Sequence, residues 1–187
     1  GEYIAFLDGD DWFMPEMLEK VYTANEQFRN LDIIQFTFHK VFQQPDGTFS
    51  APQHLSELPP EAMNRLLTGQ EMTLQTGTTG TVFGATAINV CRADFLRKNE
   101  LYQNRGLILE DFEWVFRCWF LAKRIVCLPD PLYVYCRRND SITSEKSPRF
   151  LFDMVRQFAC VPPFIRKCRV PLSIQRIWAN KWTSRIL

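Results

Sequence analysis

Residue types that often build active sites are scarce or scattered in this sequence. It contains only two histidines, His39 and His54, and six cysteines that form no Cys-x-x-Cys pair. A zinc site needs several Cys or His ligands at short spacings, and a catalytic triad needs a histidine between two suitable partners. The sequence therefore argues against zinc binding and against Ser-His-Asp or Cys-His catalysis, and neither histidine is assigned a role. The cysteines are predicted to be reduced thiols.

Long hydrophobic runs are also missing. No stretch approaches the roughly 20 apolar residues that a membrane-spanning helix requires, and the first residues show no basic segment followed by an apolar one. We therefore expect a cytoplasmic, globular protein. Its 187 residues are 46% hydrophobic and 14% aromatic, which is enough apolar material for one ordinary core. Because the chain opens on a strand-like segment rather than on Met, we expect it to be part of a longer protein.

The net charge of +1 hides an uneven distribution. Residues 1–145 carry 13 Lys and Arg against 20 Asp and Glu, a net −7, whereas residues 146–187 carry 9 against 1, a net +8. The second segment is predicted to be a basic amphipathic helical tail. Such a tail suits peripheral contact with the anionic inner face of a membrane, and a solvated helical face packed on the domain is an equal alternative. Nucleic acid is the least favoured partner.

The most informative feature is the acidic run Asp8-Gly9-Asp10-Asp11, which follows the apolar segment 1–7. Such an apolar segment is typical of a strand in the middle of a covered parallel sheet, and ligands of these sheets bind beyond the carboxyl ends of the strands. Clustered carboxylates repel each other unless a cation holds them, and their oxygens suit Mg²⁺ or Mn²⁺ carrying substrate phosphates. A surface turn or a helix cap is the simpler interpretation of this motif taken alone.

The rest of the sequence alternates predicted helices and strands, which indicates an α/β fold. Helices are predicted at 15–29, 61–67, 93–100 and 110–124, and strands at 31–42, 125–128 and 132–136, with a short apolar run at 87–91 and a return strand starting at 48–49. Residues 50–60 are predicted to be loop. The Thr- and Gly-rich segment 69–84 is predicted to be mobile or to line a ligand site.

A second acidic pair, Glu110-Asp111, opens the helix predicted at 110–124. Free N–H groups and the helix dipole stabilise negative charge there, so both carboxylates are expected to be ionised at neutral pH. A carboxylate held beside a pocket can accept a proton from an alcohol as it attacks an electrophile. Simple helix capping is the alternative. Arg137 and Arg138, followed by residues 139–141, either neutralise a diphosphate with their guanidinium groups or form a solvated hairpin end.

Taken in order, these blocks closely resemble glycosyltransferase family 2, the inverting enzymes of GT-A fold. The resemblance rests on residues 1–12, 89–96, 109–113, 131–135 and 137–143, and it runs to about residue 145. It implies that residues 1–145 are the C-terminal portion of a GT-A domain, a Rossmann-like mixed sheet with flanking helices, followed by the tail 146–187. The implied activity is transfer of a sugar, of the hexosyl type, from a nucleotide-diphospho-sugar to a hydroxyl of a glycan or lipid-linked acceptor, with inversion. A UDP-sugar donor and a role in cell-envelope polysaccharide biosynthesis are expected.

The same resemblance assigns roles to the acids and to the basic pair. Asp8 and Asp10 would form the Asp-x-Asp pair, with Asp10 binding Mn²⁺ or Mg²⁺ under the diphosphate and Asp8 or Asp11 supporting it. Asp111 would be the general base, and Glu110 would orient an acceptor hydroxyl. Arg137 or Arg138 would help the metal to absorb the charge that grows on the diphosphate.

Two departures from the family pattern bear on activity. The nucleotide-binding half that normally precedes the Asp-x-Asp strand is not in this sequence, so the donor pocket is expected to be incomplete and the isolated fragment inactive. A position near Ile88 that is often aromatic in relatives is aliphatic here, which weakens an acceptor-stacking role there. The alternative to an enzyme is a truncated, non-catalytic binding module whose acids only cap helices. A metal-dependent phosphohydrolase would need more His or Asp ligands than the sequence offers.

Overall fold

The structure is a computed structural model that describes residues 1–55, 58–78, 85–108, 110–138 and 147–186. Its strands are β1 Tyr3–Ile4, β2 Trp12–Phe13, β3 Ile33–Phe42, β4 Gln53–Leu55, β5 Asn89–Arg92 and β6 Ile125–Arg137. Its α-helices are α1 Met17–Phe28, α2 Gly69–Thr78, α3 Ala93–Lys98, α4 Asp111–Leu121, α5 Pro148–Cys168 and α6 Leu172–Ile186. Two short 3₁₀ helices are η1 Pro60–Ala62 and η2 Thr86–Ile88.

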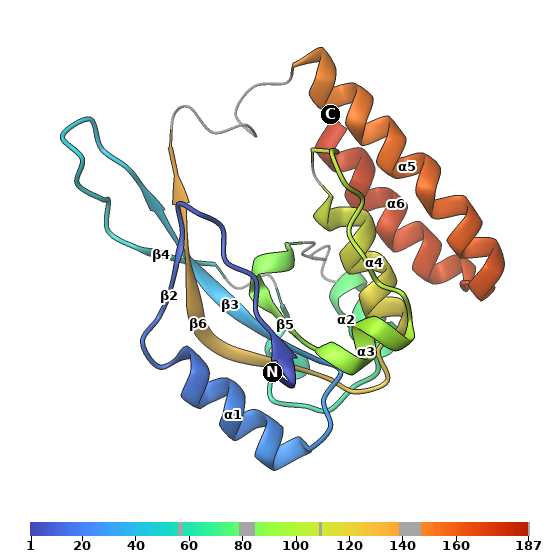
Figure 1. Cartoon of the computed structure of the whole chain (residues 1–187), viewed down its shortest axis with the longest axis horizontal. Helices are drawn as coiled ribbons and strands as arrows, with labels where there is room; N and C mark the ends of the chain where they lie inside the picture. Colours follow the sequence, from blue (N-terminus) through green and yellow to red (C-terminus); the bar gives the residue numbers. More distant parts are fainter. Residues whose placement is uncertain (56–57, 79–84, 109, 139–146, 187) are drawn as a thin grey trace.

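The strands form one mixed sheet in the order β1-β5-β3-β6-β2, with β4 added to β3. The central pair, β3 and β6, is parallel, and the other neighbours run antiparallel. Helices connect the strands, and they cover the sheet on both sides (Figure 1). The structure therefore confirms the predicted α/β fold with a mixed sheet and flanking helices.

The two faces of the sheet are covered by different helices. Successive side chains of a strand point to opposite faces, so Ile34 and Phe36 of β3 pack with the buried residues of α1, whereas Ile33 belongs to a second cluster with the aromatic residues of α4. Figure 1 shows α1 on one side of the sheet and α2, α4, α5 and α6 on the other. Because both faces are covered, the first six residues of β3 are all buried.

Helices α5 and α6 form an outer layer over α4 and α2. Phe116 of α4 packs against Trp178 of α6 with ring centroids 5.1 Å apart, and Phe158 of α5 packs against Trp182 of α6 at 4.2 Å. The two helices run side by side along the edge of the molecule (Figure 1). The basic segment 146–187 therefore contributes large side chains to the main core, and the predicted boundary near residue 145 lies outside the described residues.

The opening strand differs from the prediction. β1 is only two residues long and pairs antiparallel with β5 at one end of the strand order, instead of lying inside a parallel sheet. Ile4 and Leu7 are 37% and 53% exposed. Apolar composition predicts that a strand is suited to burial, but burial itself depends on neighbours. Among the described residues, β1 pairs with a strand on one side only.

The segment between β3 and β5 was predicted least well. Residues 53–55 form β4 instead of loop, the helix predicted at 61–67 is a 3₁₀ turn at 60–62, and residues 69–78, for which no helix was predicted, form α2. The return strand predicted at 48–49 is a single bridge between Gln43 and Phe49. Residues 79–84 lie outside the described part of the chain.

The two strands predicted at 125–128 and 132–136 are one strand, β6, with a bulge between them. Its register against β3 shifts on either side of Thr37, opposite Pro129 and Pro131. Proline cannot donate a ladder hydrogen bond and is tolerated in a sheet at such a bulge. The carbonyl of Pro129 accepts a hydrogen bond from the Thr37 hydroxyl at 2.9 Å, so the irregular point is tied to the neighbouring strand.

Within the described residues, no helix is both long enough and apolar enough to cross a membrane.

Candidate functional site

The acidic run forms a tight loop between β1 and β2. The backbone N–H of Asp11 donates to the carbonyl of Asp8 at 3.2 Å, which closes a turn over residues 8–11. The Asp11 carboxylate accepts two hydrogen bonds from β6. One is donated by the hydroxyl of Tyr133, and the other by the backbone N–H of Cys136 at 2.7 Å. Burial raises the pKa of Asp11, whereas these two hydrogen bonds lower it. Asp11 therefore anchors the loop to β6, and its predicted part in cofactor binding stays a prediction.

Asp8 is exposed to solvent, and Asp10, like Asp11, is partly exposed. Partial desolvation, followed by the negative charge of Asp10, raises the pKa of Asp8. Asp10 forms an ion pair with Arg138 at 2.9 Å, and the two side chains are 32% and 43% exposed. Asp8 and Asp10 are neighbouring carboxylates whose charges repel each other, and the guanidinium of Arg138 lies beside Asp10. The carboxylates can bind a divalent cation, and the guanidinium can bind an anion.

The residues present fit a magnesium or manganese ion that also binds substrate phosphates. Mg²⁺ is usually held by one or two carboxylates plus phosphate oxygens and water, rather than by an all-protein cage. Asp8 and Asp10 supply two such carboxylates on one turn. Within the described ranges, no group of three or more His, Cys, Asp or Glu is arranged to hold a metal alone.

Asp111 lies at the first turn of α4, next to η2. Its carboxylate accepts the backbone N–H of Thr86 at 3.4 Å. Burial, followed by the charge of Glu110, raises the pKa of Asp111 to about 6. The helix N-terminus was expected to favour the charged form, but desolvation outweighs this effect. With a pKa of about 6, Asp111 is still mostly ionised at neutral pH, as predicted, and it can both accept and release a proton there.

Glu110 precedes α4 in the N-cap position, but its side chain makes no capping hydrogen bond. Its backbone is helical and its side chain is partly exposed. Simple capping by Glu110, the alternative interpretation from the sequence, is therefore wrong. The side chain is instead close enough to Asp111 for its charge to contribute to the raised pKa of that residue.

The acidic loop and the start of α4 lie near each other. Phe6, two residues before Asp8, packs edge-on against Trp114, one turn after Asp111, with ring centroids 5.3 Å apart. The charge of Asp8 also adds a small upward contribution to the pKa of Asp111. Electrostatic influence falls with distance, so the two acidic motifs, about 100 residues apart in the sequence, share one region of the fold.

The predicted basic pair is divided between two environments. Arg137 is the last residue of β6, and its carbonyl accepts the backbone N–H of Gln43 at 3.1 Å. Arg138 follows and pairs with Asp10. The structure thus brings Arg138 to the acidic loop, as the diphosphate prediction requires, and leaves the role of Arg137 a prediction. Residues 139–146, which include Asn139 to Thr143, lie outside the described residues.

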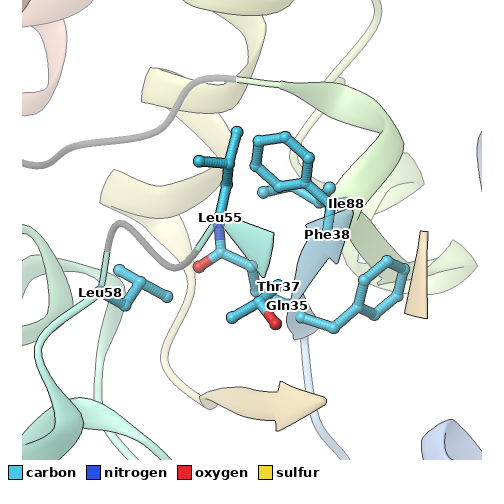
Figure 2. Close-up of a pocket in the computed structure, with 7 residues that line it drawn as sticks. Gln35, Thr37, Phe38, Leu55, Leu58 and Ile88 are labelled. Carbon is cyan, nitrogen blue, oxygen red and sulfur yellow. The ribbon is translucent and has the colours of Figure 1, made fainter. Parts of the chain in front are cut away.

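A mostly apolar hollow that the sequence did not predict lies on β3 and β4. It has about 210 Å³ of empty space, including the part that opens to solvent. Figure 2 shows Gln35 and Thr37 side by side on β3, surrounded by Leu55, Leu58 and Ile88. Gln35 is fully buried, and neither atom of its side-chain amide has a hydrogen-bond partner. An unpaired buried amide typically costs about 1–3 kcal/mol, so this arrangement is either costly or completed by another molecule.

The two histidines, which were assigned no role, lie near this hollow: His54 contacts Thr37, which lines it, and His39 packs against His54. The Thr37 hydroxyl is 2.9 Å from Nε2 of His54, and the rings of His39 and His54 pack edge-on at 5.7 Å. Their sequence separation hid this pairing, because it depends on the register of β3 and β4. The only sequence signal was the polar alternation of Gln35, Thr37 and His39 in an apolar strand, which is normally taken as a solvent-facing edge.

The hollow and Asp111 are connected through η2. Thr86, at its start, donates to Asp111, and Ile88, at its end, lines the hollow. A 3₁₀ helix rises about 2 Å per residue, so the base candidate and the hollow flank one short turn.

Comparison with known proteins identifies the family of this chain. The family profile described as glycosyl transferase family 2 matches residues 1–96, which contain the acidic loop, β3, β5 and η2. The chain belongs to glycosyltransferase family 2. This family 2 chain is 30% identical over 146 residues to the uncharacterized glycosyltransferase EpsJ of Bacillus subtilis, covering 76% of the chain and 40% of EpsJ. It is 26% identical over 145 residues to the glycosyltransferase GlyG of Streptococcus pneumoniae, covering 76% of the chain and 46% of GlyG.

Solved structures identify the fold of this family 2 chain as GT-A. The crystal structure of S. aureus TarS in complex with UDP superposes with a TM-score of 0.52 at 16% identity, covering 95% of this chain and 53% of the other. A second TarS structure gives a TM-score of 0.51 at 21% identity, covering 73% of this chain and 36% of the other. The chain thus spans less than half the length of the curated relatives that it matches.

Proposed function

We propose that this family 2 chain carries the base, metal and acceptor side of a glycosyl-transfer site. The observation that carries the proposal is the approach of the acidic loop to the start of α4, through the Phe6–Trp114 contact and the influence of Asp8 on Asp111. The reaction is transfer of a sugar, with inversion, from a nucleotide-diphospho-sugar to a hydroxyl of a glycan or lipid-linked acceptor. The UDP bound in the TarS crystal structure supports a UDP-sugar donor.

Asp111 is the proposed general base. Its carboxylate accepts the proton of the acceptor hydroxyl, and the acceptor oxygen forms a bond to the anomeric carbon. The bond between that carbon and the diphosphate oxygen breaks on the opposite face, and the leaving nucleoside diphosphate keeps the electron pair. A pKa of about 6 suits a base that works near neutral pH. Glu110, beside Asp111, is proposed to orient the same hydroxyl.

Asp10 and Asp8 are the proposed ligands of Mn²⁺ or Mg²⁺. When bound, the metal ion would neutralise charge on the diphosphate. Arg138 pairs with Asp10 at 2.9 Å, and this contact supports a role for its guanidinium in binding phosphate oxygens beside the metal ligands. Arginine matches phosphate oxygens through two parallel hydrogen bonds.

The hollow around Gln35 is the proposed contact for the acceptor. Pockets for small molecules are mostly apolar with a few polar groups that fix orientation, and Leu55, Leu58 and Ile88 around the amide of Gln35 match this description. The water-sized space in it, about 10 Å³, suits one hydroxyl or similar group of a larger acceptor. This position also gives Ile88 an apolar contact with the acceptor.

The test of the donor side is calorimetric titration of Mn²⁺ into the chain, with and without UDP. We expect metal and UDP to bind cooperatively, because each supplies ligands or charge that the other needs. Asp10→Ala should remove this coupling, whereas Asp94→Ala, a change at an acid on the exposed surface of α3 that is 64% exposed, should leave it intact. Absence of coupling in the wild-type chain would favour a non-catalytic binding module.

A further inference from the structure

The outer face of α5 combines exposed apolar and basic side chains. We define this face by Arg149, Leu151, Phe152, Val155 and Arg156, together with Arg166 and Lys167 further along the helix. Leu151, Phe152 and Val155 are 42%, 62% and 64% exposed. The opposite side of the helix is buried through Phe150, Met154 and Val161 among others, so the apolar residues on the outer face are not part of the core.

The charges of α5 have one sign on this face. The helix contains four basic residues and a single acid, Asp153. Asp153 is 4% exposed and accepts the backbone N–H of Ile108 at 3.2 Å, so it points inward. Arg149 reaches toward it from the rim at 3.7 Å and is itself 72% exposed. The outer face therefore presents cationic and apolar groups to its surroundings without an exposed acid.

Helix α1 provides a contrast within the same chain. Its exposed residues Leu18 and Tyr22 are 74% and 64% exposed, as open as those of α5. They lie among the acids Glu16, Glu19 and Glu26. Exposed apolar side chains thus occur on both helices. On α5 the exposed charged side chains are basic, whereas around α1 they are mostly acidic and the one base, Lys20, pairs with Asp130.

We propose that the outer face of α5 binds peripherally to an anionic lipid surface. The three apolar side chains would enter the boundary between headgroups and acyl chains, and the flanking arginines would pair with lipid phosphates while their alkyl stems stay apolar. The guanidinium of Arg156 lies 5.8 Å from the ring centre of Phe152, so charge and apolar surface meet at one point. Each basic residue near such a surface strengthens binding.

Charge complementarity selects this occupant over a second copy of the chain. A symmetric contact between two copies would place the same basic face against itself, and like charges repel. Figure 1 shows α5 at the outer edge of the molecule, with α6 and α4 on the side that faces the sheet. A flat surface can therefore reach α5. The proposal does not depend on the glycosyl-transfer chemistry.

The experiment is vesicle flotation of the purified chain. Vesicles of phosphatidylcholine alone are compared with vesicles that also contain phosphatidylglycerol. We expect the chain to float with the anionic vesicles only, and added salt to release it because salt screens exposed charges. The double variant Phe152→Ser/Val155→Ser and the single variant Arg156→Glu should each reduce the bound fraction on the order of tenfold.

The matched control is Leu18→Ser/Tyr22→Ser on α1, which removes similar exposed apolar surface. This control should float like the wild type, and circular dichroism should show that all variants keep their helical content. Equal binding to neutral vesicles, or equal loss in the α1 control, would overturn the proposal. Sedimentation that shows a dimer dissolved by Phe152→Ser/Val155→Ser would overturn it in favour of a self-association face.

Discussion

At the scale of single residues, the environment of Asp111 determines how the site titrates. Burial raises its pKa from 3.8 to about 6 in the folded chain. The folded state therefore binds this proton more tightly than the unfolded state, and stability falls as pH rises from about 4 to about 6. Above that window the full penalty of burying a charged carboxylate persists. The residue thus carries a cost in stability at the pH where its charged form is needed.

Asp111→Asn should separate these two effects. In the full product of the gene, we expect transfer to fall about 10²–10⁴-fold, because the amide cannot accept the acceptor proton, while donor binding is kept. The free energy of unfolding of the variant should be higher at neutral pH by about 2 kcal/mol. The wild-type kcat/KM should rise with pH through about 6.

The control is Asp94→Asn, the same chemical change in the first turn of α3. It should alter neither transfer nor the pH dependence. Retained transfer by Asp111→Asn would remove the general-base assignment, and an unchanged urea midpoint at neutral pH would contradict the burial argument.

Gln35 presents a similar conflict between stability and use. Replacing it with Met keeps the length of the side chain and removes the unpaired amide, so we expect the free energy of unfolding to increase by about 1–2 kcal/mol. If the amide contacts the acceptor, the KM for acceptor should rise about tenfold or more, because a site built to hydrogen-bond a hydroxyl loses much when that bond is missing. The donor KM should stay unchanged.

Gln157→Met is the matched control for this prediction. Gln157 is 3% exposed and its Nε2 atom also has no partner, but it lies on α5, away from the hollow. It should not change the acceptor KM. An acceptor KM that is equally insensitive to Gln35→Met would mean that the hollow holds only a buried water molecule.

At the scale of elements, α2 is a helix that the sequence analysis did not predict. Its Thr- and Gly-rich sequence lacks the spacing of an amphipathic helix, and it was predicted to be mobile or to line a ligand site. A capping box was nevertheless present: the Thr68 backbone N–H donates to Glu71 at 2.7 Å, and the Glu71 N–H donates to the Thr68 hydroxyl at 3.2 Å. This pattern of Thr and Glu three residues apart was the available signal.

The glycines of α2 serve close packing rather than flexibility. A Cβ on Gly69 would lie 1.7 Å from the backbone carbonyl oxygen of Trp119, at the end of α4. A Cβ on Gly77 would first meet the side chain of Ile177 on α6, at 2.4 Å. The two glycines let α2 approach both neighbours. Sequence rules that take glycine as a loop signal cannot anticipate contacts with helices 50 and 100 residues further along the chain.

Alanine substitutions at these two positions should have unequal effects. Gly69→Ala should lower the free energy of unfolding by about 3 kcal/mol, because a backbone carbonyl cannot move away without shifting α4. Gly77→Ala should cost less than Gly69→Ala, since the Ile177 side chain can shift more readily than a backbone carbonyl and alanine favours the helix. Urea denaturation of both variants checks the difference, and equal losses would show that α2 does not pack as described.

Most other elements were predictable because local pattern and tertiary environment agree. The helix at 15–29 and the strand at 31–42 were confirmed as α1 and β3, with boundaries shifted by about two residues. The helix at 110–124 was confirmed as α4, since its apolar stripe faces the core. In contrast, β6 was divided in two because prolines interrupt its pattern, and only its bulge against β3 explains why the strand continues.

At the scale of the whole molecule, the sequence identified the order of the motifs but not their proximity in the fold. The acidic loop, the start of α4 and Arg138 were assigned separately, and the fold brings them together through contacts of large sequence separation. The hollow at Gln35 was missed for the same reason, because it requires β4 and η2 to be placed against β3. The segment 146–187 was predicted as a tail, whereas its Trp178 and Trp182 are 3% and 5% exposed in the core.

The hydrogen bonds that hold Asp11 to β6 also limit how early in folding the acidic loop can reach its final conformation. Its partners Tyr133 and Cys136 are 122 and 125 residues further along the chain. Contacts this distant form slowly, since the intervening chain must first be ordered. During synthesis the acidic turn emerges from the ribosome long before β6 does, so until then it lacks the hydrogen bonds that β6 donates to Asp11. The capacity to capture a cation is thus expected to arise among the last events of folding.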